Sequence, residues 1–158
     1  MEILIFSPLE ILLGHSSLKY VNEKDLPRDY KTSIIINELN IDFTKPVNLV
    51  EGFFDMFVYP ENTIPICGSS LAKETYLFQT LVKKKCEVVL MLDPDVKKKT
   101  YKIAENLMSY DVNVKYADVS PFKDVGVMNS QQVRDKIASA VNVDQTFLLR
   151  SRIWALSA

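Results

Sequence analysis

Acidic residues directly follow two apolar runs of the sequence, and together they could hold a metal ion. The run 47–50 leads into Glu51, and the run 87–92 leads into Asp93 and Asp95. Bare carboxylates ~4 Å apart repel each other by ~1 to 4 kcal/mol, so such a cluster is costly without a cation. Mg²⁺ prefers hard oxygen ligands and leaves coordination positions open for phosphate. If the two runs lie side by side, the pattern predicts phosphoryl or nucleotidyl transfer.

Residues close to these acids suit a metal site. Gly52 allows a sharp backbone turn beside Glu51, and Pro94 fixes φ between the two aspartates. Asp55 falls on the first turn of the following helix, where it could support the metal ligands from behind, although helix capping alone also explains it. Asp124 follows the fourth predicted strand at the same end of the sheet, and it is a candidate ligand for a second ion.

Alternating apolar runs and helical patterns after residue 46 predict the sheet that positions these acids. Runs without polar alternation indicate parallel strands buried on both faces, and Pro65 favours an edge strand. The fold class is an open, mostly parallel α/β sheet with helices on both faces, preceded by a small irregular α+β segment, and its ligands bind beyond the carboxyl ends of the strands. The predicted strands are 47–50, 64–67, 87–92 and 113–117, the predicted helices are 53–59, 73–84, 96–110 and 130–140, and 18–22 and 33–37 resemble short strands.

Composition restricts the function further. The 158 residues carry a net charge of -1, so a nucleic-acid contact must come from a local basic patch. Cys67, Cys86 and the single His15 cannot form a Cys/His zinc site. The apolar start lacks the positive charge of a signal peptide, and no stretch is long enough to span a bilayer. We therefore expect a cytoplasmic protein without a membrane partner.

Lysines supply the local basic patch. Residues 82–102 contain seven lysines and three acids, a net charge of +4. Lys97, Lys98 and Lys99 begin a predicted helix, where cations oppose the helix dipole, so a phosphate contact is one explanation for them. A solvated helix end explains them equally well. The lysines at 83–85 end a helix, where positive charge is already favourable, and there the second explanation is preferred.

Several of these segments together resemble the Toprim fold shared by bacterial-type primases, topoisomerases and several nucleases. They are Leu-Val-Glu-Gly-Phe-Phe-Asp at 49–55, Gly-Ser beginning at Gly68, Leu-Asp-Pro-Asp at 92–95 and the pair Lys123-Asp124. The likeness covers roughly residues 46–128. The Glu-Gly-x-x-Asp form and the later Lys-Asp pair look most like the primases. Lys19-Tyr-Val-Asn22 also resembles the Lys-Tyr-x-Asn segment upstream of the primase Toprim domain.

The resemblance implies an enzyme that joins nucleoside triphosphates into RNA primers on single-stranded DNA during DNA replication, with Mg²⁺ or, as a substitute, Mn²⁺. It implies the following roles: Glu51 as the acid/base or metal-associated carboxylate, Asp93 and Asp95 as metal ligands, Asp124 at an outer metal or nucleotide site, and Lys19 and Asn22 near nucleotide or template. Beside these we expect Lys97, Lys98, Lys99 and Lys123 near nucleotide or nucleic acid, and Gly52, Asp55 and Gly68 in support. Two departures concern the second metal site. Val-Lys-Lys-Lys at 96–99 replaces the small residue and glycine of typical primases, and Gly126 stands where an acid is common.

The predicted organisation is a remnant of the primase amino-terminal subdomain at 1–45, a Toprim core at 46–128 and a carboxyl-terminal helical tail at 129–158. There is no room for zinc-binding and helicase-binding domains, so we expect a reduced or split protein such as phages encode, acting in the host cytoplasm, or a fragment. A replicative helicase or a separate primase subunit would then be a partner, and primer synthesis by the chain alone would be inefficient. A Toprim nuclease and a non-catalytic interaction module remain alternatives.

Overall fold

The computed structural model describes residues 2–5, 19–22, 34–68 and 70–156. Strands β1 (Glu2–Ile5) and β2 (Lys19–Asn22) form an antiparallel pair. Lys19 and Asn22 therefore lie at the ends of a strand, but their side chains are outside the described part of the chain. The prediction of a strand at 33–37 is wrong for the described residues 34–37. Asn37 turns the chain with φ 68, and the 3₁₀ turn η2 (Glu38–Asn40) follows.

The main sheet has five strands in the order β4-β3-β5-β6-β7. Its first four members pair in parallel, and the last one is antiparallel to β6. This arrangement confirms the predicted open, mostly parallel sheet, with the Pro65 strand at an edge. The strands are β3 (Val47–Val50), β4 (Thr63–Pro65), β5 (Val88–Met91), β6 (Val114–Tyr116) and β7 (Val141–Asn142). The sequence reading did not predict β7, which joins the sheet from the segment expected to be helical.

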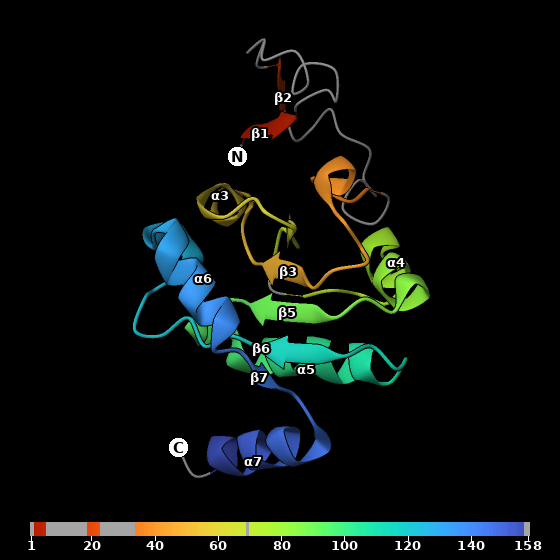
Figure 1. Cartoon of the computed structure of the whole chain (residues 1–158), viewed down its shortest axis with the longest axis vertical. Helices are drawn as coiled ribbons and strands as arrows, with labels where there is room; N and C mark the ends of the chain where they lie inside the picture. The colour runs from red at the N-terminus through yellow and green to blue at the C-terminus, as the bar shows by residue number, and fades with distance from the viewer. Residues whose placement is uncertain (1, 6–18, 23–33, 69, 157–158) are drawn as a thin grey trace.

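Helices cover both faces of this sheet, as predicted (Figure 1). One core cluster joins Leu49 and Leu90 of the sheet to α4, α5 and α7, and a second joins Val50 and Met91 to α3 and α6. Successive strand residues thus point to opposite layers, which explains the continuous apolar runs. The helices are α3 (Phe53–Val58), α4 (Tyr76–Lys84), α5 (Lys97–Met108), α6 (Ser130–Ala138) and α7 (Gln145–Leu156), with 3₁₀ turns η3 (Pro94–Val96) and η4 (Val125–Val127).

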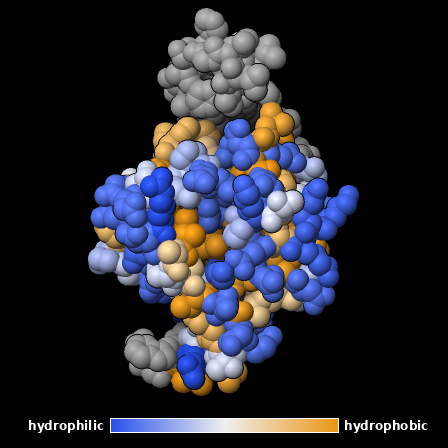
Figure 2. Space-filling model, viewed as in Figure 1, coloured by the Kyte–Doolittle hydropathy of each residue, from blue (hydrophilic) through white to orange (hydrophobic). Residues whose placement is uncertain are grey.

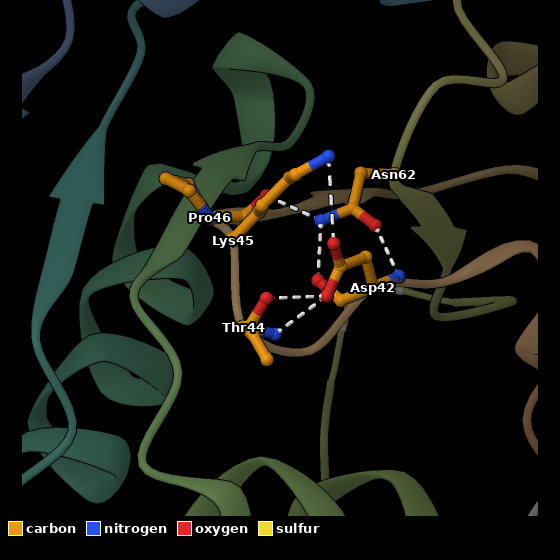
Figure 3. Close-up of polar contacts among 5 residues, drawn as sticks. All are labelled: Asp42, Thr44, Lys45, Pro46 and Asn62. Carbon is orange, nitrogen blue, oxygen red and sulfur yellow. Dashed lines mark hydrogen bonds and ion pairs between the residues drawn. The ribbon is translucent and has the colours of Figure 1, made fainter.

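A network of polar contacts, here called the Asn62 clamp, fixes the amino ends of β3 and β4 (Figure 3). Asn62 Nδ2 donates to the carbonyl oxygens of Asp42 at 3.1 Å and Pro46 at 2.6 Å, and Asn62 Oδ1 accepts from the Asp42 N–H at 2.7 Å. Asp42 in turn accepts from the Thr44 N–H and hydroxyl and pairs with Lys45 at 3.4 Å. The clamp therefore joins the segment that enters β3 to the segment that enters β4.

The helix α7 carries apolar side chains on its outer surface. Leu149 and Ile153 are exposed, and apolar surface is visible at the end of the molecule where α7 lies (Figure 2). Across the described residues, no helix combines the length and the apolar character needed to cross a bilayer.

Candidate metal and nucleotide site

The two strands that end in acids are direct neighbours in the sheet. Val50, the last residue of β3, pairs in register with Met91 of β5. Glu51 and Asp93 therefore emerge at the same edge, and the Glu51 carboxylate accepts a hydrogen bond from the backbone N–H of Asp93. Asp95 lies in η3 beside them. The condition on which the sequence argument depended, that the two acid-bearing runs lie side by side, is met.

Five carboxylates at this edge influence one another, and we call them the acidic rim: Glu51, Asp55, Asp93, Asp95 and Asp124. Burial, followed by the charges of the other four, raises the pKa of Asp93 to about 6. Burial and the charge of Asp95 also raise the pKa of Glu51 above its usual range. The repulsion expected from the sequence is therefore present in the fold.

Two oxygen atoms of the acidic rim are buried without a hydrogen-bond partner in the described structure. They are Oε2 of Glu51 and Oδ1 of Asp93. A buried carboxylate oxygen without a donor is costly, and a cation is one way to compensate for it. These atoms are hard oxygen donors of the type that Mg²⁺ prefers. The chemistry of the donors fits the ion.

The carboxylates of the acidic rim do not surround a common position in this structure. Within residues 34–68 and 70–156, no three His, Cys, Asp or Glu side chains are arranged to hold one ion. Asp95 is exposed, whereas Glu51 and Asp93 are half-buried. Rotation about side-chain torsions would be needed to bring the three carboxylates to one ion, and the exposed Asp95 is the freest to make it.

The Asp55 carboxylate holds the loops of the acidic rim together through hydrogen bonds with their backbone. Its Oδ2 accepts from the Gly52 N–H at 2.7 Å, and its carboxylate also accepts from the backbone of Gly126. Burial raises the pKa of Asp55 despite these bonds, and the charge of Asp124 raises it further. Asp55 therefore ties the loop after β3 to the loop that carries Asp124. It also caps α3 through the Gly52 N–H, so helix capping explains this residue as well.

Gly126 has a steric role that the sequence comparison with primases did not reveal. A Cβ atom at this position would lie 2.9 Å from Asp55 Oδ1 and 3.2 Å from Asp124 Oδ1. The two carboxylates pack against the bare backbone, and Asp124 Oδ1 also accepts from the Val127 N–H at 3.0 Å. Gly126 is thus needed for the close approach of these acids, whatever its part in a second metal site.

The loop after β4 joins the same edge. The Gly68 N–H donates to the carbonyl oxygen of Glu51 at 3.2 Å, and Gly68 has a φ of 151°, which favours glycine. The sheet thus brings together three loops that are separate in the sequence. They follow β3, β4 and β5.

The predicted cationic residues take different positions. Lys97 pairs with Asp118 at 3.5 Å, whereas the charge of Lys99 lowers the pKa of Glu51 and so acts on the acidic rim. Lys98 and Lys123 are exposed. The lysines at the start of α5 therefore do not form one uniform patch.

Asp118 was missed by the sequence argument. Burial raises its pKa, but hydrogen bonds from Ser120 and the nearby Lys97 ammonium outweigh burial and leave the pKa below its usual range. Asp118 follows the fourth strand closely, so the rule that selected Glu51 and Asp93 also points to it. Its ion pair with Lys97 makes it a partner of the α5 amino terminus.

Comparisons with known proteins agree with this architecture. No protein-family model matches the sequence. The DNA primase of Thermotoga maritima is 31% identical in an alignment of 123 residues, which covers 71% of this chain and 21% of that primase. A crystal structure of the Aquifex aeolicus primase, comprising zinc-binding and RNA polymerase domains, has a TM-score of 0.52 at 20% identity, over 62% of this chain and 26% of that one. The chain thus spans about a fifth of the primase it matches in sequence. It is homologous to a DNA primase and shares the fold of a solved one.

Proposed function

We propose that this chain is the Toprim catalytic domain of a primase-type enzyme, which transfers nucleotides to a growing primer on single-stranded DNA with the help of Mg²⁺. One observation carries the proposal: the neighbouring parallel strands β3 and β5 end in Glu51 and Asp93, whose buried oxygens lack partners. The homology to a DNA primase supports the choice of reaction.

In this proposal Glu51, Asp93 and Asp95 hold the ion, and Asp124 contributes to an outer metal or nucleotide position. A bound Mg²⁺ would supply positive charge against the phosphate and make an attacking hydroxyl easier to deprotonate. Glu51, which accepts a hydrogen bond from the backbone of Asp93, would also accept the proton of that hydroxyl. Asp55 keeps the loops in place through Gly52 and Gly126. Lys99 and Lys123 would meet nucleotide phosphates.

Metal binding is tested by following thermal unfolding while Mg²⁺ or Mn²⁺ is added. A ligand that binds only the folded state stabilises it by about 1.4 kcal/mol at ten times its Kd, so the wild-type midpoint should rise. Asp93→Asn should remove this rise. Asp111→Asn is the matched control, because Asp111 is an exposed aspartate whose φ of 60° asparagine also tolerates. A wild-type midpoint that does not move at millimolar metal would contradict the proposal.

The reaction is tested separately, by incorporation of labelled ribonucleotides on a single-stranded DNA template. Asp93→Asn should lower incorporation at least ~100-fold, because the ion would lose a ligand. The Asp111→Asn control should keep the wild-type rate. Strand cleavage in place of incorporation would replace the primase proposal with a nuclease. Wild-type folding without either reaction would favour an interaction module.

A further inference from the structure

A groove with a basic lining lies beside the acidic rim, between α5, α7 and the β6–β7 edge of the sheet. We call it the edge groove, and its volume is about 1130 Å³. Its charged lining residues are Lys97, Lys98, Lys102, Lys136 and Arg150 against Glu105 and Asp118, a net charge of +3. The whole chain has a net charge of -1. Positive charge is therefore concentrated in this groove.

The floor of the edge groove is a packed aromatic cluster. The rings of Tyr101 and Tyr116 lie edge to face with centroids 5.6 Å apart, and Tyr101 and Phe147 do the same at 5.6 Å. Tyr116 is only 6% exposed. Because these rings pack on one another, they are not open platforms for stacking bases. A ligand of this groove would be recognised mainly through its charge.

Two cations on opposite helices remain available to such a ligand. Lys97 pairs with Asp118, Lys102 with Glu105, and Lys136 donates to the Ser120 carbonyl. Lys98 of α5 and Arg150 of α7 are exposed, and neither has an ion-pair partner in the part of the chain that the structure describes. Lys98 and Arg150 are therefore the residues with which to test the groove.

The edge groove begins close to the acidic rim along the chain. Asp95 lies in η3, and Lys97, the first residue of α5, lines the groove two positions later. The ion pair between Lys97 and Asp118 stands where the groove meets the carboxyl ends of β5 and β6. A polynucleotide with its end at the acidic rim would enter the groove past the amino terminus of α5, where the helix dipole favours phosphate.

We propose that the edge groove binds the phosphate backbone of the single-stranded DNA on which the acidic rim acts. The identity of the ligand rests on the proposed function. Its position rests on the charge of the groove and on the two-residue separation between Asp95 of the rim and Lys97 of the groove. An acidic peptide would match the charge, but only a polynucleotide would also place its end at a nucleotidyl-transfer site. Arg150 thereby gains a role that the sequence did not indicate.

The test is the binding of a fluorescent thymidine oligodeoxynucleotide, followed by anisotropy in EDTA over a range of salt concentrations. The double variant Lys98→Gln with Arg150→Gln should bind roughly tenfold more weakly at 0.1 M salt. Its slope of log Kd against log salt should fall by ~1.4, since each lost phosphate contact on a single strand contributes ~0.7. The control is Lys83→Gln with Lys84→Gln, which removes the same charge from α4 and should leave both quantities unchanged.

A charge-retaining variant and a check of helix content separate the loss of charge from a loss of folding. The charge-retaining variant Lys98→Arg with Arg150→Lys should bind as the wild type does, and far-UV circular dichroism should show equal helix content in all variants. Unchanged affinity of the double glutamine variant, an equal loss in the α4 control, or equally tight binding of poly-glutamate would overturn the groove assignment.

The two proposals can fail separately. The Mg²⁺-dependent rise in unfolding midpoint should survive in the double glutamine variant, and Asp93→Asn should still bind the oligonucleotide in EDTA. Loss of the metal response in the wild type with intact oligonucleotide binding counts against the proposed function. An intact metal response with no contribution of Lys98 and Arg150 to binding counts against the edge groove alone.

Discussion

The two ends of the parallel strands of the main sheet carry polar residues of opposite character. At the amino end, the Asn62 clamp satisfies donors and acceptors with one another, and Asn62 alone makes three hydrogen bonds. At the carboxyl end, the acidic rim gathers like charges, and two of its buried oxygens have no partner. One buried atom near the amino end, Oδ1 of Asn48, is also without a partner, so the contrast concerns charge more than hydrogen bonding.

This difference separates the part of the molecule that stabilises the fold from the part available for chemistry. A neutral, satisfied network adds stability and leaves nothing to bind a ligand. Neighbouring carboxylates lower stability until a cation arrives, and perturbed pKa values of this kind are common at functional sites. Substitutions at the two ends should therefore differ in how strongly their effects depend on metal.

The largest effect is expected at the amino end. Asn62→Ala removes three hydrogen bonds and places alanine at a φ of 50°, so the free energy of unfolding should fall by about 2 to 3 kcal/mol. Urea denaturation measures this, and Asn113→Ala at an exposed position is the control. The loss should be equal with and without Mg²⁺. A loss that vanished in saturating metal would show that the two ends are coupled.

Gly126→Ala should have an intermediate effect. The new Cβ would approach Asp55 Oδ1 to 2.9 Å, so the buried Asp55 carboxylate must shift. Overpacking of this kind costs about 1 to 2 kcal/mol, and the Mg²⁺-dependent rise in unfolding midpoint should shrink. A double-mutant cycle checks the cause: in an Asp55→Ala background the same substitution should cost clearly less. Additive effects would rule out this contact.

The smallest effect is the pH dependence of the acidic rim without metal. The pKa of Asp93 is about 6 in the fold and near 3.8 when unperturbed, so between these values the folded state binds more protons. Stability should therefore fall as pH rises from about 4 to 6 and then level off, by on the order of 1 kcal/mol after solvent screening. Urea denaturation in EDTA measures it. The difference in free energy of unfolding between the wild type and Asp93→Asn isolates the contribution of Asp93. A difference that stays constant with pH would contradict the prediction.

The sequence predicted the sheet because the relevant signals are local. The apolar runs of β3 and β5 indicate strands that are buried on both faces of the sheet. Pro65 has no backbone N–H to donate to a neighbouring strand, so its strand lies at an edge. Neighbouring parallel strands then place Glu51 and Asp93 at one edge. The position of these acids follows from topology, which is why it could be predicted without coordinates.

Features that depend on tertiary contacts were not predictable. The run Ile34-Ile35-Ile36 has strand propensity, but Ile35 alone is buried and Asn37 turns the chain away. The partners of Asn62 lie 16 and 20 residues away, and no local pattern marks them. The close packing of Gly126 against two carboxylates likewise needs the folded loops.

The short strand β7 has a consequence for how copies of this protein meet one another. Open sheets end in rows of unpaired backbone groups, which invite pairing with another chain and, in time, fibrous aggregates. Here the β6 side of the sheet is closed by only Val141–Asn142, running in the opposite direction. So short a border offers few backbone groups for strand addition, and so protects the molecule from polymerising with itself along that side.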